Sequence, residues 1–271
     1  MFKLILAPWK TIWDQRDLLK KLSGRRIELR HRGSLMGMVW MVLDPILILC
    51  VYLLVFGYIF QGQFIEGDQE TPIVYGITIF LGLSIFRLFS EVISTTTASV
   101  VSSSNYVKRI VFPLEILPLI EIATAMYSFF YTMIIVSVGL VVSGLNIIST
   151  NILLLPFIFI PFFMLLMGIG WILSALNVYI RDMSHTIQFI SISMLFGSAI
   201  FYPVNQIPES FWSFLKYNPI LHFVESVRCV IIWQKMPQIE PLLWIIGFSV
   251  GIFYAGYGTF RYLRKGFADV L

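Results

Sequence analysis

The chain has 271 residues, of which 58% are hydrophobic and only 13% charged, and its mean hydropathy is +0.85. This composition excludes a soluble globular protein, because so apolar a chain cannot hide its surface in a water-soluble core. The formal net charge of +4 lies beside apolar runs, where it serves membrane insertion and contact with anionic lipid, so it indicates no nucleic-acid partner. We therefore expect an all-α membrane protein that crosses the bilayer several times.

Residues 1–37 predict a helix at the cytoplasmic membrane surface. Its apolar side chains recur at helical spacing between charged ones, and they are Trp9, Ile12, Trp13, Leu18, Leu19 and Leu22. Such a stripe is typical of a helix that lies in the headgroup plane, here broken at Ser23-Gly24. The alternative is that it packs on the protein's own cytoplasmic helix ends. Because no small-residue cleavage site follows a short apolar run, we expect the first span to be retained.

A basic run directly before the first long apolar segment determines the orientation. It comprises Arg25, Arg26, Arg30, His31 and Arg32. Guanidinium groups are costly in hydrocarbon, so the membrane boundary is expected at residues 33–40. Lys and Arg accumulate on the cytoplasmic flank of a span, which puts both termini in the cytoplasm. Fifteen of the 19 Lys and Arg residues then lie inside, three lie outside, and Arg87 lies within a span.

Six apolar runs predict six membrane-spanning helices. They cover residues 38–60, 73–89, 116–142, 152–176, 187–202 and 242–262. The chain is thus expected to be a single domain with an interfacial segment 1–37, a six-span core 38–262 and a cytoplasmic tail 263–271. Between the last two spans, residues 207–217 and 220–232 are each too short to cross, and we expect two re-entrant helices in the outer leaflet. Within the last span, Gly247, Gly251 and Ala255 predict a close-packing face.

Two features of the first span have alternative interpretations. Asp44-Pro45 marks either a helix start or a kink near the inner surface, and we favour a kink or a restart of the helix. Tyr52, Phe56 and Phe60 follow at intervals of four and therefore share one helix face. They are either packing or lipid-facing aromatics, or a stacking surface for a sugar chain.

Ionisable and sulfur-containing residues inside the spans are few. Arg87 and Glu91 lie one helical turn apart and predict a structural ion pair within the membrane, or else a gate or a contact for an anionic substrate. Cys50 and Cys229 form no metal-binding or redox motif, so we expect both to be buried packing residues.

Motifs for chemistry are largely missing from the sequence. There is no Gly-x-x-x-x-Gly-Lys-Ser/Thr phosphate-binding loop, so the chain is not expected to bind ATP by that route. Three scattered histidines, His31, His185 and His222, predict no metal site. Glu66 and Asp68 read as a solvated acidic loop outside the membrane. The alternative is a site that binds a metal or acts on a lipid-linked sugar, as in a membrane glycosyltransferase.

Four ordered segments resemble the motifs of ABC-transporter permeases of the polysaccharide-export type. They are Arg30 to Gly37 with Trp40, Leu43-Asp-Pro45 and Tyr52 to Gly57; Lys108 to Pro118; Leu176 to Asp182; and Tyr217-Asn-Pro219 with Arg228. The resemblance covers nearly the whole chain, and the motifs are specific jointly although each alone is weak. His31 replaces a commoner aromatic, and Asp44 precedes a proline that often follows other residues, which leaves the particular polymer open.

The resemblance implies a transport subunit of the bacterial inner membrane that is not itself an enzyme. Two copies would form a channel, and two separate ATP-binding-cassette ATPases would bind ATP and Mg²⁺ and supply the energy, so this chain would bind no cofactor. The cargo would be a polysaccharide on an undecaprenyl-diphosphate-type lipid, such as O-antigen. Alternatives are teichoic acid, capsule, or small lipids and drugs. A secondary transporter fits less well, because the two halves show no obvious repeat.

The resemblance also suggests roles for three groups of residues. Guanidinium groups offer paired donors to a lipid diphosphate, and the candidates are Arg25, Arg26, Arg30 and Arg32. The alternative is that these four arginines only determine the membrane topology. Coupling to the ATPases is expected at the N-terminal helix and at Lys108, Arg109, Phe112, Pro113 and Glu115. A sliding polymer needs flat contacts of low directionality, which favours an aromatic conduit of Tyr52, Phe56, Phe60, Phe196, Phe201 and Tyr202.

Overall fold

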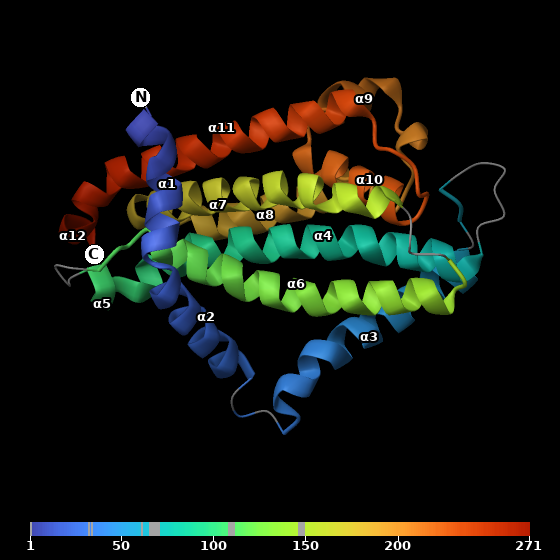
Figure 1. The fold of residues 1–271 in the computed structure, drawn as a ribbon, viewed down its shortest axis with the longest axis horizontal. Coiled ribbons are helices and arrows are strands. Elements are labelled where there is room, and N and C mark those ends of the chain that lie inside the picture. The colour runs from blue at the N-terminus through green and yellow to red at the C-terminus, as the bar shows by residue number, and fades with distance from the viewer. Residues whose placement is uncertain are drawn as a thin grey trace.

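A computed structural model describes residues 2–31, 33, 35–60, 62–64, 71–107, 112–145 and 150–271. The regular elements of these residues are all helical, which confirms the all-α prediction (Figure 1). In chain order they are α1 Phe2–Asp14, α2 Arg16–His31, η1 Gly37–Val39, α3 Trp40–Tyr52, η2 Leu53–Phe60, α4 Pro72–Ser99, η3 Val101–Ser103, α5 Ser104–Val107, α6 Ile116–Val142, η4 Thr150–Leu154, α7 Leu155–Tyr179, α8 Met183–Gly197, η5 Val204–Gln206, α9 Glu209–Leu215, α10 Pro219–Ile231, α11 Ile239–Leu263, η6 Arg264–Gly266 and α12 Phe267–Val270.

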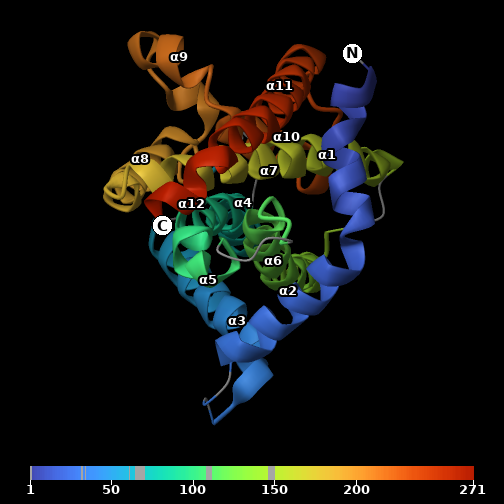
Figure 2. The ribbon, with the colours of Figure 1, turned by 90° about the vertical axis from the view of Figure 1, so that its left-hand side faces the viewer.

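Helix α4 is the centre of the bundle, and α3, α6, α7, α8 and α10 pack around it (Figures 1 and 2). Every residue from 74 to 82 is buried, which is what an apolar helix surrounded by other helices requires. Both termini, α5 and α12 lie at one end of the bundle, here called the terminal end. Helices α9 and α10 lie at the opposite end, here called the hairpin end.

The second predicted span, 73–89, is too short, because α4 continues to Ser99. Its last part is rich in Ser and Thr, but these side chains do not need outside partners. Thr95 and Thr96 donate hydrogen bonds to the carbonyls of Glu91 and Val92, at 2.8 and 2.6 Å, one turn earlier. A hydroxyl bonded back to its own helix can be buried without loss, so polarity does not end the helix here.

Five helical segments in the described part of the chain are long and apolar enough to cross a bilayer. They are Gly37–Phe60, Pro72–Ser99, Ile116–Val142, Thr150–Tyr179 and Ile239–Val270. The remaining predicted span corresponds to α8, which has only 15 residues. At 1.5 Å per residue it is about 22 Å long, less than the roughly 30 Å hydrocarbon core. A crossing at α8 therefore stays a prediction.

The two short helices expected before the last span are present as α9 and α10. Asn218 begins α10 by accepting a hydrogen bond from the Ile220 N–H at 3.0 Å, and Pro219 fits the first helical position. The apolar face of α10 is buried, as its spacing predicts. In contrast, Phe211 and Phe214 of α9 are exposed. Whether this pair enters a membrane as re-entrant helices stays a prediction.

The N-terminal segment forms two helices that bend at Gln15, so the predicted break at Ser23-Gly24 is wrong. Helix α1 lies against α11, where the Thr11 and Tyr257 hydroxyls are 2.7 Å apart. Helix α2 lies along α6. Ile12, Leu18, Leu19 and Leu22 of the apolar stripe thus pack on the protein's own helices, while Trp9 and Trp13 are 41% and 68% exposed, and a position in the headgroup plane stays a prediction.

The first span contradicts one of the two interpretations of Asp44-Pro45 and the prediction for Cys50, while a kink at Pro45 stays a prediction. Helix α3 begins at Trp40 and runs without a break through Pro45, so Pro45 does not start a helix. The change comes at Leu53, where the chain adopts the wider π-helix η2. Cys50 is exposed and Cys229 partly buried, so the expected burial of Cys50 is wrong.

Helices α7 and α11 meet through glycine, but at a different position from the one expected. A Cβ atom on Gly256 would lie 2.2 Å from the Gly168 carbonyl oxygen, and one on Gly168 would lie 2.4 Å from the Ile252 carbonyl oxygen. Gly247 and Gly251 instead face open space. The close-packing face predicted from Gly247, Gly251 and Ala255 is therefore wrong by one residue, which rotates the contact by 100° around the helix.

We expect Gly256→Ala to destabilise the protein, because the added methyl group overlaps the α7 backbone, which cannot move aside as a side chain can. The matched control is Gly251→Ala on the same helix, where a methyl group meets nothing within 4 Å. Heating the detergent-solubilised protein and measuring the monodisperse fraction should give a lower apparent Tm for Gly256→Ala only. Equal Tm values for the two variants would contradict the observed helix contact.

Candidate functional site

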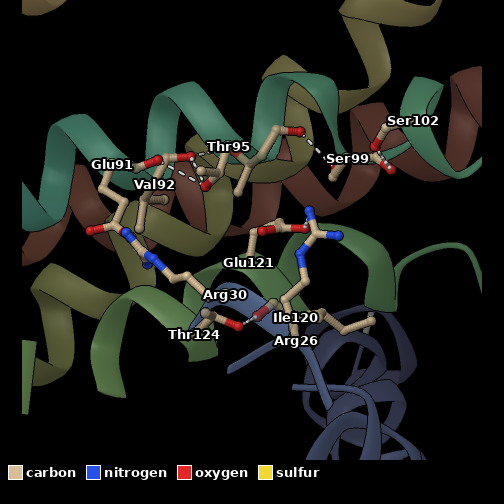
Figure 3. A network of polar contacts seen from close by, with 11 residues as sticks. Arg26, Arg30, Glu91, Val92, Thr95, Ser99, Ser102, Ile120, Glu121 and Thr124 are labelled. Carbon is tan, nitrogen blue, oxygen red and sulfur yellow. Dashed lines mark hydrogen bonds and ion pairs between the residues drawn. The ribbon is translucent and has the colours of Figure 1, made fainter. Parts of the chain in front are cut away.

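Two ion pairs hold α2 against α4 and α6 near the terminal end (Figure 3). Arg26 on α2 contacts Glu121 on α6, with Nη2 and Oε1 2.8 Å apart. One turn later on α2, Arg30 contacts Glu91 on α4, with Nη1 and Oε1 2.5 Å apart. We call Arg26, Arg30, Glu91 and Glu121 the charged cluster. The carboxylates are largely buried and the arginines about half exposed, so the arginines supply the charge that the buried carboxylates need.

The charged cluster corrects the predicted pair of Arg87 and Glu91. Although these residues are one turn apart on α4, Glu91 binds Arg30, and Arg87 is exposed and in no ion pair within the described residues. The sequence reasoning also missed Glu121. A carboxylate inside an apolar run requires a positive partner, and this signal was available for Glu121. The partner itself, 95 positions earlier in the chain, could not be read from spacing.

The four arginines proposed for a lipid diphosphate are thus not equivalent. Arg26 and Arg30 already bind carboxylates, while Arg25 is exposed and lines a neighbouring cavity of about 200 Å³. Arg32 lies outside the described residues. An arginine has five N–H donors, so one carboxylate leaves donors on Arg26 and Arg30 for a further anion.

Cavities connect the charged cluster to the first span. One of about 380 Å³ is lined by all four members of the charged cluster. A smaller one of about 70 Å³ extends from Arg30 and Glu91 to Asp44 and Arg87. Arg87 also borders a largely apolar groove of about 480 Å³ between α3, α4 and α8, which reaches Tyr52. Arg87 therefore stands where a polar cavity meets an apolar groove.

All six aromatic residues predicted for a conduit come together at the other end of this groove. Tyr52 stacks on Phe56 with ring centroids 5.5 Å apart, and Phe56 stacks on Phe60 at 5.6 Å. Phe56 also stacks on Phe201 at 5.6 Å, although the two are 145 positions apart. Phe196 lies 6.3 Å from Phe201, and the Tyr202 hydroxyl donates to the Phe196 carbonyl. We call these six residues the aromatic cluster.

The segment predicted to couple with ATPases is described only in part. Lys108 and Arg109 lie outside the described residues. Phe112 packs on Tyr106 with centroids 4.5 Å apart, and the Pro113 carbonyl accepts the N–H of Ile116 at the start of α6. Glu115 is buried, binds the Arg264 guanidinium, and accepts a hydrogen bond on its carbonyl from Trp171 Nε1 at 2.9 Å. This segment is therefore tied to α7 and to the end of α11.

Within the described residues, no group of three or more His, Cys, Asp or Glu side chains could hold a metal ion. Glu66 and Asp68 lie outside those residues, so the acidic loop stays a prediction. Nor do the charged and aromatic clusters contain a nucleophile beside a base. Their chemistry is suited to binding: charges for an anion at one end, and flat apolar faces at the other.

The family model for ABC-2 type transporters matches residues 17–232, which include both clusters. The chain belongs to the ABC-2 type transporter family. Its similarity to individual members extends over nearly their whole length. It is 25% identical to the O-antigen export system permease protein RfbA of Myxococcus xanthus, over 96% of this chain and 97% of that protein.

Two further relatives are similar over almost as much of the chain. The RfbA permease of Klebsiella pneumoniae is 23% identical over 94% of this chain and 95% of its own. The polysialic acid transport protein KpsM of Escherichia coli is 24% identical over 91% and 93%. This ABC-2 type chain is thus similar over nearly its whole length to proteins named for O-antigen export and for polysialic acid transport.

Charge exchange tests the pairing of Arg30 with Glu91. We expect Arg30→Glu to lower the apparent Tm by roughly 2–6 °C, because it opposes two carboxylates in a partly buried site. Adding Glu91→Arg should restore most of this loss, since the opposite charges then face each other again.

Lys21→Glu is the matched control, because Lys21 is an exposed residue of α2 with no ion pair in the described structure. It should leave the Tm unchanged. If the double variant is no more stable than Arg30→Glu alone, the two side chains do not interact in the folded protein.

Proposed function

We propose that this chain is the membrane subunit of an ATP-driven exporter that moves a lipid-linked polysaccharide, such as O-antigen, across the bacterial inner membrane. The observation that carries this proposal is the end-to-end similarity to polysaccharide-export permeases. Two copies form the channel, and two ATP-binding-cassette subunits bind ATP and Mg²⁺. Both termini lie in the cytoplasm, α8 provides the sixth crossing, and α9 and α10 re-enter the outer leaflet.

The terminal end is proposed to receive the lipid diphosphate. Arg87 has no carboxylate partner in the described structure and borders both the polar cavity and the apolar groove. A diphosphate beside Arg87, with help from the spare donors of Arg30, leaves the prenyl chain along the apolar side of the same groove. Arg25 and Arg26 then lie on the approach from the cytoplasm, and Arg32 adds to the positive field.

The aromatic cluster is proposed to carry the glycan. A sliding chain must not be held by many directional bonds. The C–H face of a sugar can pack on an aromatic ring whichever way the sugar is rotated about the ring normal, so this contact is suited to sliding. Phe60 and Phe196, at the two ends of the row, are 68% and 61% exposed and so are open to contact with a polymer. Phe56, in the middle, keeps the row together by stacking on three other rings.

Phe56→Ala is expected to lower export roughly fivefold or more, because it removes the ring on which Tyr52, Phe60 and Phe201 stack. The readout is surface polysaccharide on cells in which the variant replaces the native chain, normalised to membrane protein level. Leu54→Ala, an exposed position of the same π-helix, is the control and should export normally. Normal export by Phe56→Ala would overturn the conduit, and export of small lipids or drugs without any polysaccharide would overturn the cargo.

Reversing the charges of the coupling segment tests how ATP hydrolysis reaches the channel. The double variant Lys108→Glu and Arg109→Glu is expected to insert normally but to uncouple the ATPase from export. The reason is that the two positive charges proposed to hold the segment at its docking surface are replaced by negative ones. ATP hydrolysis by the purified complex and surface polysaccharide in cells are measured together. Export at the normal rate would refute the docking assignment.

A further inference from the structure

The hairpin end contains a cavity of about 580 Å³, larger than each cavity around the charged cluster described above. It lies between α10, α9, the turn after Pro203 and the segment that leads into α11. One wall is the buried ring of Phe64. Its other lining includes two indoles and several polar side chains, namely Trp212, Trp233, Asn205, His222, Glu225 and Gln238.

Within the described residues, the two tryptophans of this cavity are not stacked on other rings. Most aromatic residues of the bundle, including five of the six in the aromatic cluster, pack ring against ring, but neither Trp212 nor Trp233 has such a neighbour in the described structure. The Trp233 indole nitrogen is also buried without a hydrogen-bond acceptor among the described residues. Because a buried N–H without an acceptor is unfavourable, a ligand oxygen in the cavity would supply what is missing.

Polar groups around the indoles are able to bind hydroxyls. The Asn205 and Gln238 amides are exposed and make no hydrogen bond within the described residues. Glu225 is one-third exposed. Its Oε2 lies 3.9 Å from Nη1 of Arg228, a distance too long for a tight ion pair. Amides and a carboxylate next to flat indole faces match a pyranose ring, which has apolar C–H faces and a rim of hydroxyls.

The wall of the cavity is rigidly held. Arg228 on α10 is completely buried and donates to the carbonyls of Ala199 and Ile200, at 2.8 and 2.6 Å. Its Nε–H also donates to the Thr78 carbonyl of α4 at 3.3 Å. These charge-assisted hydrogen bonds fix α10 against α4 and against the chain just after α8. A binding site built on such a wall is formed before its ligand arrives.

The cavity and the aromatic cluster border the same small core from two sides. A small core of Phe64, Tyr75 and Ile79 separates the two. Phe56 and Phe201 of the aromatic cluster pack on this core, and so does Trp233 of the cavity. Only this core therefore lies between the rings of the aromatic cluster and the indole of Trp233.

We propose that this cavity is a saccharide-binding subsite that takes one or two pyranose residues of the glycan as it leaves the aromatic cluster. The inference rests on the proposed function, because it takes the exported glycan as the ligand. Trp212 and Trp233 stack on the sugar faces, the Trp233 N–H donates to a ring or hydroxyl oxygen, and Asn205, Glu225 and Gln238 bind hydroxyls.

Binding is tested with delipidated fragments of the source bacterium's own surface polysaccharide, released by mild acid. Isothermal titration to the full-length chain in nanodiscs should give a millimolar or tighter Kd. Trp212→Ala should weaken it about fivefold or more, and Trp233→Phe, which keeps a ring but loses the N–H, should weaken it by a smaller factor. The control Trp13→Ala removes an exposed indole on α1, remote from the cavity, and should bind as the native chain does. The Tm of every variant is measured as well, and binding is compared only between variants whose Tm equals that of the native chain, so a folding defect is not mistaken for a loss of binding.

The outcomes separate the two proposals. If deletion of the gene leaves surface polysaccharide unchanged, the proposed function fails. If deletion abolishes surface polysaccharide, but the fragments do not bind or bind equally well to Trp212→Ala, only the subsite fails. Weaker binding by Trp212→Ala and Trp233→Phe, with normal binding by Trp13→Ala, establishes the subsite.

Discussion

Buried carboxylates that need a positive partner determine how the N-terminal part of this chain is arranged. Glu91 and Glu121 lie inside an apolar bundle, where an unpaired charge is strongly unfavourable. Only α2 supplies arginines to them in the described structure, and it does so twice, one turn apart. The position of α2 along α6, and therefore the polar cavity beside it, follows from this requirement. A third carboxylate, Glu115, follows the same rule with Arg264 and brings the end of α11 to the start of α6.

The molecule divides its chemistry between its two ends. Charges and small polar cavities lie toward the terminal end, while stacked rings and a larger, indole-lined cavity lie toward the hairpin end. Helix α4 joins them, since it carries Glu91 near one end and packs on the aromatic cluster near the other. An amphipathic ligand with an anionic group, an apolar chain and a polyhydroxyl chain finds a matching surface for each part along this single helix. This order of surfaces is the physical basis for considering a glycolipid.

Sequence periodicity was sufficient for several features that depend on local spacing, although the ends of α2 and α4 were not among them. The long apolar runs, the row of Tyr52, Phe56 and Phe60, and the helix that begins at Pro219 all follow from residues within a few turns of one another. Contacts between segments far apart in the sequence could not be predicted from spacing. The chain offers Arg87 as a neighbour for Glu91, but the fold supplies Arg30 instead, because the competition between two partners is settled by helix packing. Likewise, Gly251 and Gly256 look equivalent in sequence, and only the rotation of α11 against α7 decides which one is in contact.

The N-terminal helices are fastened at two separate points. Thr11 on α1 binds Tyr257 of α11, while Arg26 and Arg30 on α2 bind α6 and α4. The segment formed by α1 and α2 is therefore attached to the bundle on both sides of its bend at Gln15. The bend thus lies between these two attachments, and the N-terminal segment links the last long helix, α11, to the central helix, α4.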